Sequence, residues 1–505
     1  MRTSIILIIL ILFVTSCKDD TPFNENSDTS DTLNECAITQ FEFKAIDNPE
    51  ILINDLIAEI QDSTITIRIP HIVDNKILKP TVSYIGDTIY FEGYRDEYID
   101  FSTPTKCIVS NNDGNKKTYT VIVTAFTELP IVYIETENKA NIVSKDDYLN
   151  ATISIQNDIY TRSSTLDLEK TPVRIKGRGN STWNLPKKPY KLKFDSKISL
   201  LGEPKDKEWV LLANYTDKSN LRNATAFFMG DTMTALDWTP CSHFVELILN
   251  GVYKGTYQLS EQVKISNDRV NVTDNGYLLE VDQLERLEPD DVYFKTNKIL
   301  LNIKDPDVEN ESEAYNWIKD YVNNVENTLY SESFLDEKSG YAQYIDMQSF
   351  VDWYLVQEIA KNNDGIFFSS CYMHIAPNGK LIMGPLWDFD IAFGNVNYNN
   401  NMDPTGFWIR NAAWIERMAE DPTFNSLVRK RFDEIYQNKN LIYNYINENA
   451  TYLKYSVIEN NSVWNTLYHN TGSNDKIWGS YENEIQCLKD FISKRLEWLN
   501  NNLPK

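Results

Sequence analysis

The stretch Gly379-Lys-Leu-Ile-Met-Gly-Pro-Leu-Trp-Asp-Phe-Asp-Ile-Ala-Phe-Gly-Asn395 places two carboxylates, Asp388 and Asp390, directly after a short apolar run. If the backbone stays extended there, side-chain alternation puts both carboxylates on one face and Phe389 on the other. Paired carboxylates repel each other unless a proton or a cation lies between them, and hard oxygen ligands favour Mg²⁺, Mn²⁺ or Ca²⁺. An isolated Asp-x-Asp is more often an acidic turn that caps a strand, so the rest of the chain has to decide.

A predicted helix and hairpin precede this stretch. Asp346 can N-cap a helix in which apolar residues recur every four positions, at Val351, Leu355 and Ile359. Two strands are predicted next, over 366–375 and 380–386, around the turn Pro377-Asn378-Gly379. Asp364 lies before this hairpin, 24 residues ahead of Asp388. One hairpin can therefore bring these two acids together.

The N-terminus predicts export and a lipid anchor. The apolar run Ile5–Val14 is too short for a transmembrane helix, which needs about 20 residues. Together with the basic Arg2 before it, this run is typical of a signal peptide over 1–16. Val14-Thr15-Ser16-Cys17 resembles a bacterial lipobox, which would make Cys17 the lipidated N-terminus, and Lys18-Asp19-Asp20 resembles the surface-export signal of Bacteroidetes lipoproteins. These resemblances imply an outer-membrane, lipid-anchored, surface-exposed protein; a plain secreted protein is the alternative. Residues 17–36 are predicted to form a disordered acidic tether.

Composition limits the partners. A chain of 505 residues has room for two to four domains, and a net charge of −24 argues against nucleic acid as a partner, because nucleic acid binds basic surfaces. Residues 37–126 show several short alternating strands, among them Ile65–Ile69, which indicate an immunoglobulin-like β-sandwich. Cys36 and Cys107 fall near or in this module and could pair in an oxidising compartment.

Strand patterns recur through about 128–300, and two of them carry candidate phosphate-binding residues. Val173–Lys176 leads into Gly177-Arg178-Gly179, whose glycines let backbone amides approach phosphate oxygens, although a tight hairpin uses the same residues. In Tyr190-Lys191-Leu192-Lys193-Phe194 the apolar residues share one strand face, and Lys191 and Lys193 share the other. These two lysines are either solvated or form a clamp on phosphate oxygens.

Further elements complete the outline. Ser219 is a plausible N-cap for a helix over 219–236, and Asn250-Gly251 predicts a hairpin that Glu261 closes. A strand over 276–281 carries Glu280, and an apolar stripe predicts a final helix over 481–499.

Eight segments together resemble the CotH family, in family order, from about 130 to 500. They are Lys176-Gly-Arg-Gly-Asn-Ser-Thr-Trp183, Lys187-Lys-Pro-Tyr-Lys-Leu-Lys193, Lys207-Glu-Trp-Val-Leu-Leu-Ala-Asn-Tyr215, Leu221-Arg-Asn223, Phe244-Val-Glu-Leu247, Glu261-Gln262, Gly276-Tyr-Leu-Leu-Glu280 and Trp387-Asp-Phe-Asp390. The resemblance implies an atypical protein-kinase-like fold that transfers phosphate from ATP to protein serine. The expected fold class is therefore α+β: an Ig-like β-sandwich, then a two-lobed kinase-like domain over 128–505. Its β-rich N-lobe would span about 128–300 and its helical C-lobe about 301–505.

The resemblance also implies roles for the acids. Protein kinases use the order catalytic-loop Asp, hairpin, metal-binding Asp, which matches Asp364 and Asp388 here. Asp364 would orient the acceptor hydroxyl, and Asp388 and Asp390 would bind Mg²⁺ or Mn²⁺, with ATP as phosphate donor. The acceptor would be a protein or a surface polymer.

The cationic residues take the complementary part. Lys191 or Lys193, with Arg178, would contact phosphates, while Glu261 or Glu280 would fix a lysine or hold a second ion.

Departures from the conventional kinase pattern leave alternatives open. The position five residues after Asp364, where a conventional kinase has Asn, is Ser369, and the predicted helix over 219–236 has no Glu to pair with a strand lysine. A catalytically inactive surface binding or adhesion lipoprotein is therefore the second hypothesis. A glycosyltransferase with an Asp-x-Asp site is the third, which the missing strand–helix alternation disfavours.

Overall fold

The computed structural model describes residues 36–49, 52, 55–70, 76–157, 165–272, 275–472 and 476–505. The predicted signal peptide, the lipidation site Cys17 and the predicted tether up to residue 35 lie outside the described residues. The chain divides into two compact units, whose main boundary falls between Thr124 and Ala125. No helix among the described residues is both long enough and apolar enough to cross a membrane.

The first unit consists of strands. One sheet has the order β2-β1-β6, a second has the order β3-β4-β10-β9-β7, and β5 pairs with β8. Phe41 of β1 contacts Phe91 of β7 with ring centroids 6.4 Å apart, so the two larger sheets share a core. Cys36 and Cys107 are buried free thiols in the structure, so the possible disulfide is not formed. The strands are β1 (Ala37–Phe43), β2 (Leu56–Ile57), β3 (Glu59–Gln61), β4 (Thr64–Pro70), β5 (Ile77–Leu78), β6 (Pro80–Ile85), β7 (Thr88–Phe91), β8 (Ile99–Asp100), β9 (Thr105–Ser110) and β10 (Lys116–Phe126).

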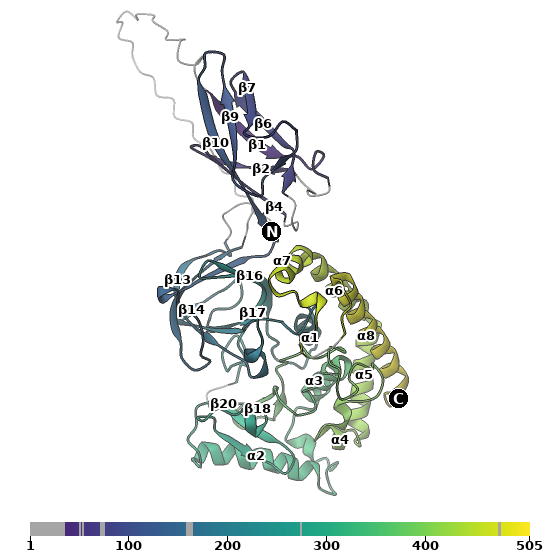
Figure 1. The fold of residues 1–505 in the computed structure, drawn as a ribbon. Helices are drawn as coiled ribbons and strands as arrows, with labels where there is room; N and C mark the ends of the chain where they lie inside the picture. The colour runs from purple at the N-terminus through teal and green to yellow at the C-terminus, as the bar shows by residue number, and fades with distance from the viewer. Residues whose placement is uncertain are drawn as a thin grey trace, which may run out of the picture. The chain divides into compact units, whose positions relative to one another are not determined.

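The second unit begins with a closed barrel of order β11-β12-β13-β14-β15-β17-β16 (Figure 1). Parallel pairing of β11 with β16, which sets Ile131 opposite Glu246, closes it. The alternation predicted for β14 is confirmed: Tyr190, Leu192 and Phe194 are buried in the barrel core and the lysines between them are not. The strands are β11 (Ile131–Thr136), β12 (Leu149–Gln156), β13 (Leu168–Gly177), β14 (Tyr190–Ile198), β15 (Asp206–Leu212), β16 (Ser242–Leu249) and β17 (Val252–Glu261).

The helix expected over 219–236 is shorter, and its predicted cap is wrong. Helix α1 spans Arg222–Asp231. Asp217 takes the place of Ser219, because its carboxylate accepts the Arg222 N–H at 2.8 Å and the Ser219 N–H at 3.0 Å. Asp217 also pairs with the buried Arg222 side chain. A charged acceptor here satisfies helix N-terminal donors that a serine hydroxyl would otherwise serve.

A second sheet of order β19-β20-β18-β21-β22 follows the barrel. Its strands are β18 (Tyr277–Val281), β19 (Tyr293–Lys295), β20 (Leu300–Asp305), β21 (Cys371–Ile375) and β22 (Ile382–Met383). Helix α2 (Glu313–Leu329) is not among the predicted elements, although the sequence contains its signal. Ser312 caps it, and its buried residues recur at helical spacing: Tyr315, Ile318, Val322, Val325 and Leu329.

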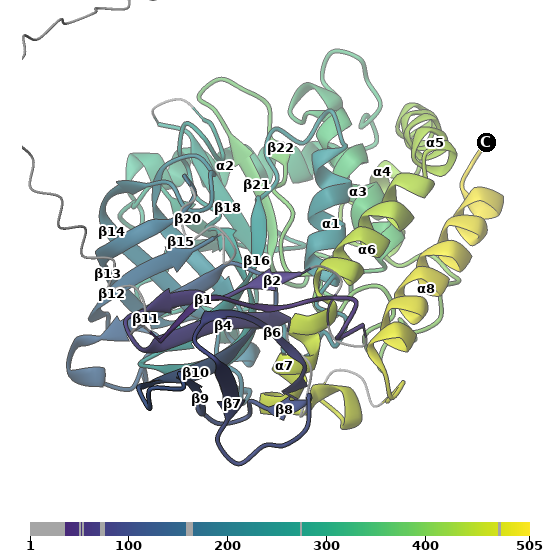
Figure 2. The same cartoon turned by 90° about the horizontal axis from the view of Figure 1, so that it is seen from above.

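The C-terminal part is helical, as predicted. Helix α3 (Met347–Ala360) is capped by Asp346, which accepts the Ser349 N–H. It is followed by α4 (Ile415–Met418), α5 (Pro422–Gln437), α6 (Asn440–Tyr452), α7 (Lys454–Trp464) and α8 (Tyr481–Asn502). The apolar stripe of α8 is buried, and Figure 2 shows α8 running beside α6. The chain is thus a mixed α+β protein, strand-rich first and helical later.

The predicted order of helix, Asp364, hairpin and carboxylate pair is present, with local differences. β21 and β22 are shorter than the strands expected over 366–375 and 380–386. The backbone at Asp388 is not extended but has φ +64°. Phe389 is nevertheless fully buried while both neighbouring carboxylates face a cavity, so the expected separation of faces arises from loop geometry and not from a strand.

Candidate functional site

A cavity of about 920 Å³ opens in the second unit between the barrel, the second sheet and the loops after α3 and β22. Most of the residues singled out from the sequence line it: Arg178, Lys191, Glu280, Asp364, Asp388 and Asp390. Lys193 and Glu261 do not line it. Its lining combines acidic side chains on loops, which we call the acidic wall, with cationic side chains on β13, on β14 and in the turn between them, which we call the cationic wall.

Asp388 and Asp390 form the centre of the acidic wall. Asp390 accepts a hydrogen bond from the Thr216 hydroxyl at 2.8 Å, and Asp388 accepts one from Ser370 at 3.4 Å. Burial, with repulsion from Asp388, raises the pKa of Asp390 to about 8. Without a cation, the pair holds a proton that an exposed aspartate would have lost at neutral pH.

Asparagine side chains hold this irregular segment in place through its backbone. Asn362 donates to the Asp388 carbonyl at 3.1 Å, and Asn395 donates to the Asp390 carbonyl at 2.7 Å. The Phe389 N–H donates to Asn223 Oδ1 at 2.7 Å. These amides come from the end of α3, from the loop after the pair and from α1, so three separate elements position the carboxylates.

Asp364 lies on the loop after α3 in the same cavity. Its carboxylate accepts the Asn363 side chain at 2.9 Å and the Ser369 hydroxyl at 3.3 Å, and lies 3.9 Å from the Arg286 guanidinium. Burial and, secondly, the charge of Asp388 raise its pKa. Ser369, at the position of the conventional Asn, therefore binds Asp364 itself.

The cationic wall combines Lys176, Arg178 and Lys191. Lys191 lies 2.8 Å from Glu208, while burial lowers its pKa and the Glu208 charge opposes that shift. Lys193 lies 3.6 Å from the same carboxylate but outside the cavity lining. The structure thus separates two lysines that share one strand face in the sequence.

The glycine turn lines the cavity, but two of its amides are already bonded within the fold. The Gly177 N–H donates to Ser144 O at 2.9 Å, and the Arg178 N–H donates to Pro189 O at 3.2 Å. A Cβ on Gly177 would lie 2.4 Å from the Trp183 ring, and Gly179 has φ +85°. The glycines therefore serve a tight, packed turn, and it is the Arg178 side chain that reaches the cavity.

The two glutamates differ. Glu261 accepts the Cys241 N–H at 2.9 Å and lies 3.6 Å from Arg269, so it fixes no cavity lysine. Glu280 lines the cavity, lies 3.5 Å from Lys304, and has its pKa raised by burial. Glu280 therefore contacts a lysine, Lys304, that the sequence analysis did not single out.

Three cavity residues are missed by sequence reasoning: Thr216, Arg286 and Lys304. Lys304 follows Leu301 and Ile303 on β20, and this alternation was a usable signal. Arg286 lies in a short 3-10 helix, Leu284–Arg286, where no periodicity marks it.

The acidic wall fits a hard divalent cation. Its donors are carboxylate and hydroxyl oxygens, and burial with neighbouring acids raises the pKa values of Asp390 and Asp364, although Arg286 lies 3.9 Å from Asp364. Among the described residues, no three His, Cys, Asp or Glu side chains come close enough to hold a metal by themselves. Mg²⁺ commonly binds through one or two carboxylates and completes its shell with water and phosphate oxygens, and this donor set suits that mode.

Fold and site define a mixed α+β protein with a cavity that is lined by both carboxylates and cationic side chains. The model of the CotH kinase protein family matches residues 174–499, more than half of the chain. The chain belongs to the CotH kinase protein family.

Two other comparisons add little. A search of curated proteins finds no match. A crystal structure from Bacteroides thetaiotaomicron, provisionally described as a glycoside hydrolase, shares 12% identity over 58% of this chain and 89% of that chain, with a TM-score of 0.17. Likeness at this level carries no argument about function.

Proposed function

We propose that this chain is a cell-surface lipoprotein whose CotH domain transfers phosphate from metal-bound ATP to the hydroxyl of Ser or Thr, in a protein or another surface acceptor. The observation that supports the proposal is that Lys191 and Arg178 line the same cavity as Asp388 and Asp390. Phosphoryl transfer asks for positioned phosphates, a cation on them and a carboxylate at the attacking hydroxyl. These three demands match the cavity lining.

In this proposal each residue has one task. Asp388 and Asp390 hold Mg²⁺ or Mn²⁺, which neutralises charge on the phosphates. Lys191 and Arg178 hold phosphate oxygens by charge-assisted hydrogen bonds. The acceptor hydroxyl gives its proton to Asp364 as its oxygen bonds to the γ-phosphorus. The bond from that phosphorus to the β-phosphate oxygen breaks, and ADP leaves.

Lipid anchoring through Cys17 on the outer membrane is the second half of the proposal, and the strand-rich first unit would be an Ig-like spacer. The apolar run before Cys17 and the small residues preceding it support this localisation. Labelling of cells with a radioactive fatty acid tests it: the wild type should take up label and Cys17→Ala should not. Equal labelling of both would refute the anchor.

The transfer itself is tested with the purified protein, labelled ATP, Mg²⁺ or Mn²⁺ and a serine-rich acceptor. Label should reach the acceptor only with metal, and Asp364→Asn or Asp388→Asn should lower the rate at least about 10³-fold, because each removes a charge used in the transition state. Asp320→Asn, an exposed acid on α2, is the control and should retain full activity. No binding at millimolar ATP would exclude the kinase.

An inactive binding lipoprotein remains the alternative, and one observation favours it. Ser369 stands where a second metal ligand would be and bonds Asp364 instead. Nucleotide binding that depends on Asp388, without transfer to any acceptor or to water, would select this alternative.

A further inference from the structure

The segment Asn399–Asn411 lies against the end of α3, directly beside the loop that carries Asp364. Its key contact is Trp408, which lines the cavity. The indole N–H of Trp408 donates to Asn362 O at 3.0 Å and to Asn363 O at 3.3 Å. The two residues before Asp364 are thus held through their carbonyl groups by one side chain from 44 positions later in the chain.

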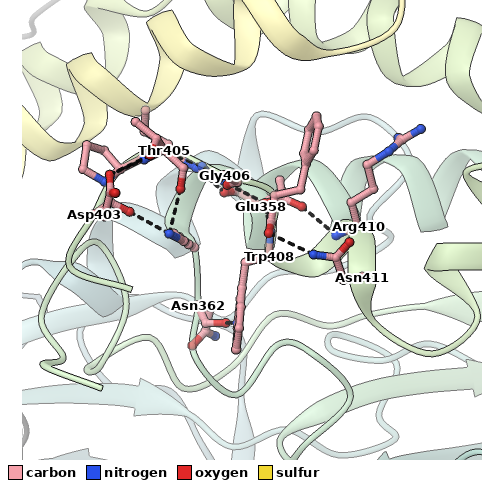
Figure 3. Close-up of polar contacts among 12 residues, drawn as sticks. Glu358, Asn362, Asp403, Thr405, Gly406, Trp408, Arg410 and Asn411 are labelled. Atoms are coloured by element: carbon pink, nitrogen blue, oxygen red, sulfur yellow. Dashed lines mark hydrogen bonds and ion pairs between the residues drawn. The ribbon is translucent and has the colours of Figure 1, made fainter. Parts of the chain in front are cut away.

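Glu358, in the last turn of α3, fixes the backbone on both sides of this tryptophan. Its carboxylate accepts the Trp408 N–H at 2.8 Å and the Arg410 N–H at 2.7 Å (Figure 3). Glu358 is fully buried and forms an ion pair with Arg495 of α8, which is also fully buried. One carboxylate oxygen therefore has a charged donor, Arg495, and a neutral donor, the Trp408 N–H, while the other oxygen has the neutral Arg410 N–H.

Arg495 extends the same contacts to the start of the segment. It donates to Pro404 O at 2.8 Å and to Gly406 O at 2.6 Å, and its Nε donates to Glu358 O at 2.9 Å. Lys361, the left-handed residue that ends α3, donates to Asp403 O at 2.7 Å and Thr405 O at 2.8 Å. Loop carbonyls thus receive donors from two buried cations.

Burying an ion pair costs desolvation, and a hydrophobic pair of similar volume is often as stable. What this pair does is specify a conformation, because Glu358 and Arg495 both bond to backbone groups of residues 404–410, and Arg495 also bonds to the Glu358 carbonyl of α3. That segment delivers the Trp408 indole to Asn362, whose side chain in turn donates to the Asp388 carbonyl at 3.1 Å. A single chain of contacts therefore reaches both acidic loops of the cavity.

We propose that Trp408, held by the buried Glu358–Arg495 pair, is a positioning residue that sets the places of Asp364 and Asp388 for phosphoryl transfer. This inference rests on the proposed function for its catalytic consequence, but not for its structural one. Trp408 acts through Asn362 and Asn363, and it touches neither reacting atom in this scheme.

The test replaces Trp408 with Phe, which removes the indole N–H and keeps an aromatic ring. The control is Trp414→Phe, because the Trp414 indole also donates a hydrogen bond, to Glu326 at 2.7 Å, although Trp414 is fully buried whereas Trp408 is half-buried. Trp408→Phe should lower kcat about 10- to 100-fold with KM for ATP within about twofold, since small misplacement of a catalytic group has effects of this size. Trp414→Phe should stay within about twofold in both.

A second readout needs no activity. Amide hydrogen exchange of the ligand-free protein over residues 362–366 should be at least about tenfold faster in Trp408→Phe than in Trp414→Phe, because the loop loses its anchor. Glu358→Gln should also speed exchange in this segment. It is the second variant in case Trp408→Phe folds poorly, because its side-chain amide keeps one carbonyl acceptor. Unchanged exchange in the 362–366 segment in both Trp408→Phe and Glu358→Gln would overturn the inference. A wild type without transfer would refute the proposed kinase and leave the exchange comparison valid.

Discussion

The two walls of the cavity place their charges by different means. Lys176 and Lys191 stand opposite each other on neighbouring strands of a closed barrel, and Arg178 lies in the turn between those strands. Asp364 and Asp388 lie on loops, in backbone that belongs to no strand or helix; the neighbouring Asn363 bonds Asp364, and asparagines distant in sequence hold the backbone at Asp388 and Phe389. A strand presents its side chains by its own geometry, whereas a loop needs partners to do so.

The walls also differ in how their charge is balanced. Lys191 already has a carboxylate, Glu208, at 2.8 Å. At the acidic wall Arg286 lies 3.9 Å from Asp364, but the pKa values of Asp364 and Asp390 are still raised, because burial and neighbouring acids disfavour their charged forms. A cation that comes with a ligand should therefore bind most favourably at the acidic wall. At the cationic wall we expect loss of a charge to lower mainly the rate of transfer. At the acidic wall we expect loss of an asparagine contact to lower mainly the stability of the fold.

The largest effect expected from the comparison of the two walls is a difference in transfer rate between variants of Lys191 and Lys193, which share one strand face. Lys191→Met should lower kcat/KM for transfer about 10²-fold, because it removes a charge at the phosphates. Lys193→Met is the matched control, since this lysine contacts the same Glu208 carboxylate from outside the cavity, and it should change kcat/KM less than about twofold. Steady-state kinetics with labelled ATP measures both. Equal effects from the two variants would contradict the claim that Lys191, and not Lys193, contacts the phosphates from the cationic wall.

A second prediction concerns pH and metal at the acidic wall. The folded protein holds a proton on Asp390 up to about pH 8, whereas the unfolded chain loses it near pH 4, so stability without metal should fall as pH rises between these values. Asp390→Asn should remove part of that slope and raise the free energy of unfolding at pH 8 by about 1–3 kcal/mol. Urea unfolding at pH 6 and pH 8, with and without Mg²⁺, measures this.

In the same experiment Mg²⁺ should stabilise the wild type more at pH 8 than at pH 6, because at the lower pH it must displace a proton. Two results would contradict the assignment of Asp390 as a buried metal ligand. One is that the wild type gains stability with rising pH and Asp390→Asn does not; the other is that Mg²⁺ stabilises Asp390→Asn as much as the wild type.

The smallest expected effect is on stability, and it tests the asparagine contacts that hold the acidic wall. Asn223→Ala leaves the buried Phe389 N–H without an acceptor and should cost about 1–2 kcal/mol of stability. Asn438→Ala is the control, because its exposed side chain donates to Glu434 O at 2.9 Å at the end of α5, and it should cost less than about 0.5 kcal/mol. Thermal unfolding compares the two. If both cost the same, the loop has other means of support.

Several elements could be predicted because their signals are local. The period-two pattern of β14 and the apolar stripe of α8 were both confirmed, since backbone geometry alone sets these repeats. α2 carries an equally regular apolar repeat after the cap Ser312, so this helix too has a local signal, although it is not among the predicted elements. The cap of α1 was predicted wrongly for a physical reason: Asp217 is a stronger acceptor than Ser219 and lies in reach only after the chain turns.

The candidate site was only partly predictable. The order helix, Asp364, hairpin and Asp388 is written in the sequence, because each piece is recognised from its own residues. That Lys191 and not Lys193 lines the cavity, and that Glu261 lies elsewhere, depends on how the barrel meets the second sheet. Arg286 has no local signal at all.

The sequence by itself determined the family, the strand alternation and the spacing of the acids, because these depend on residues close together in the chain. Only the tertiary structure decided how the acids are held. Asn223 reaches Phe389 across 166 positions, and Arg495 reaches Glu358 across 137. No pattern within a segment predicts such contacts, since they form only when packing brings distant parts of the chain together.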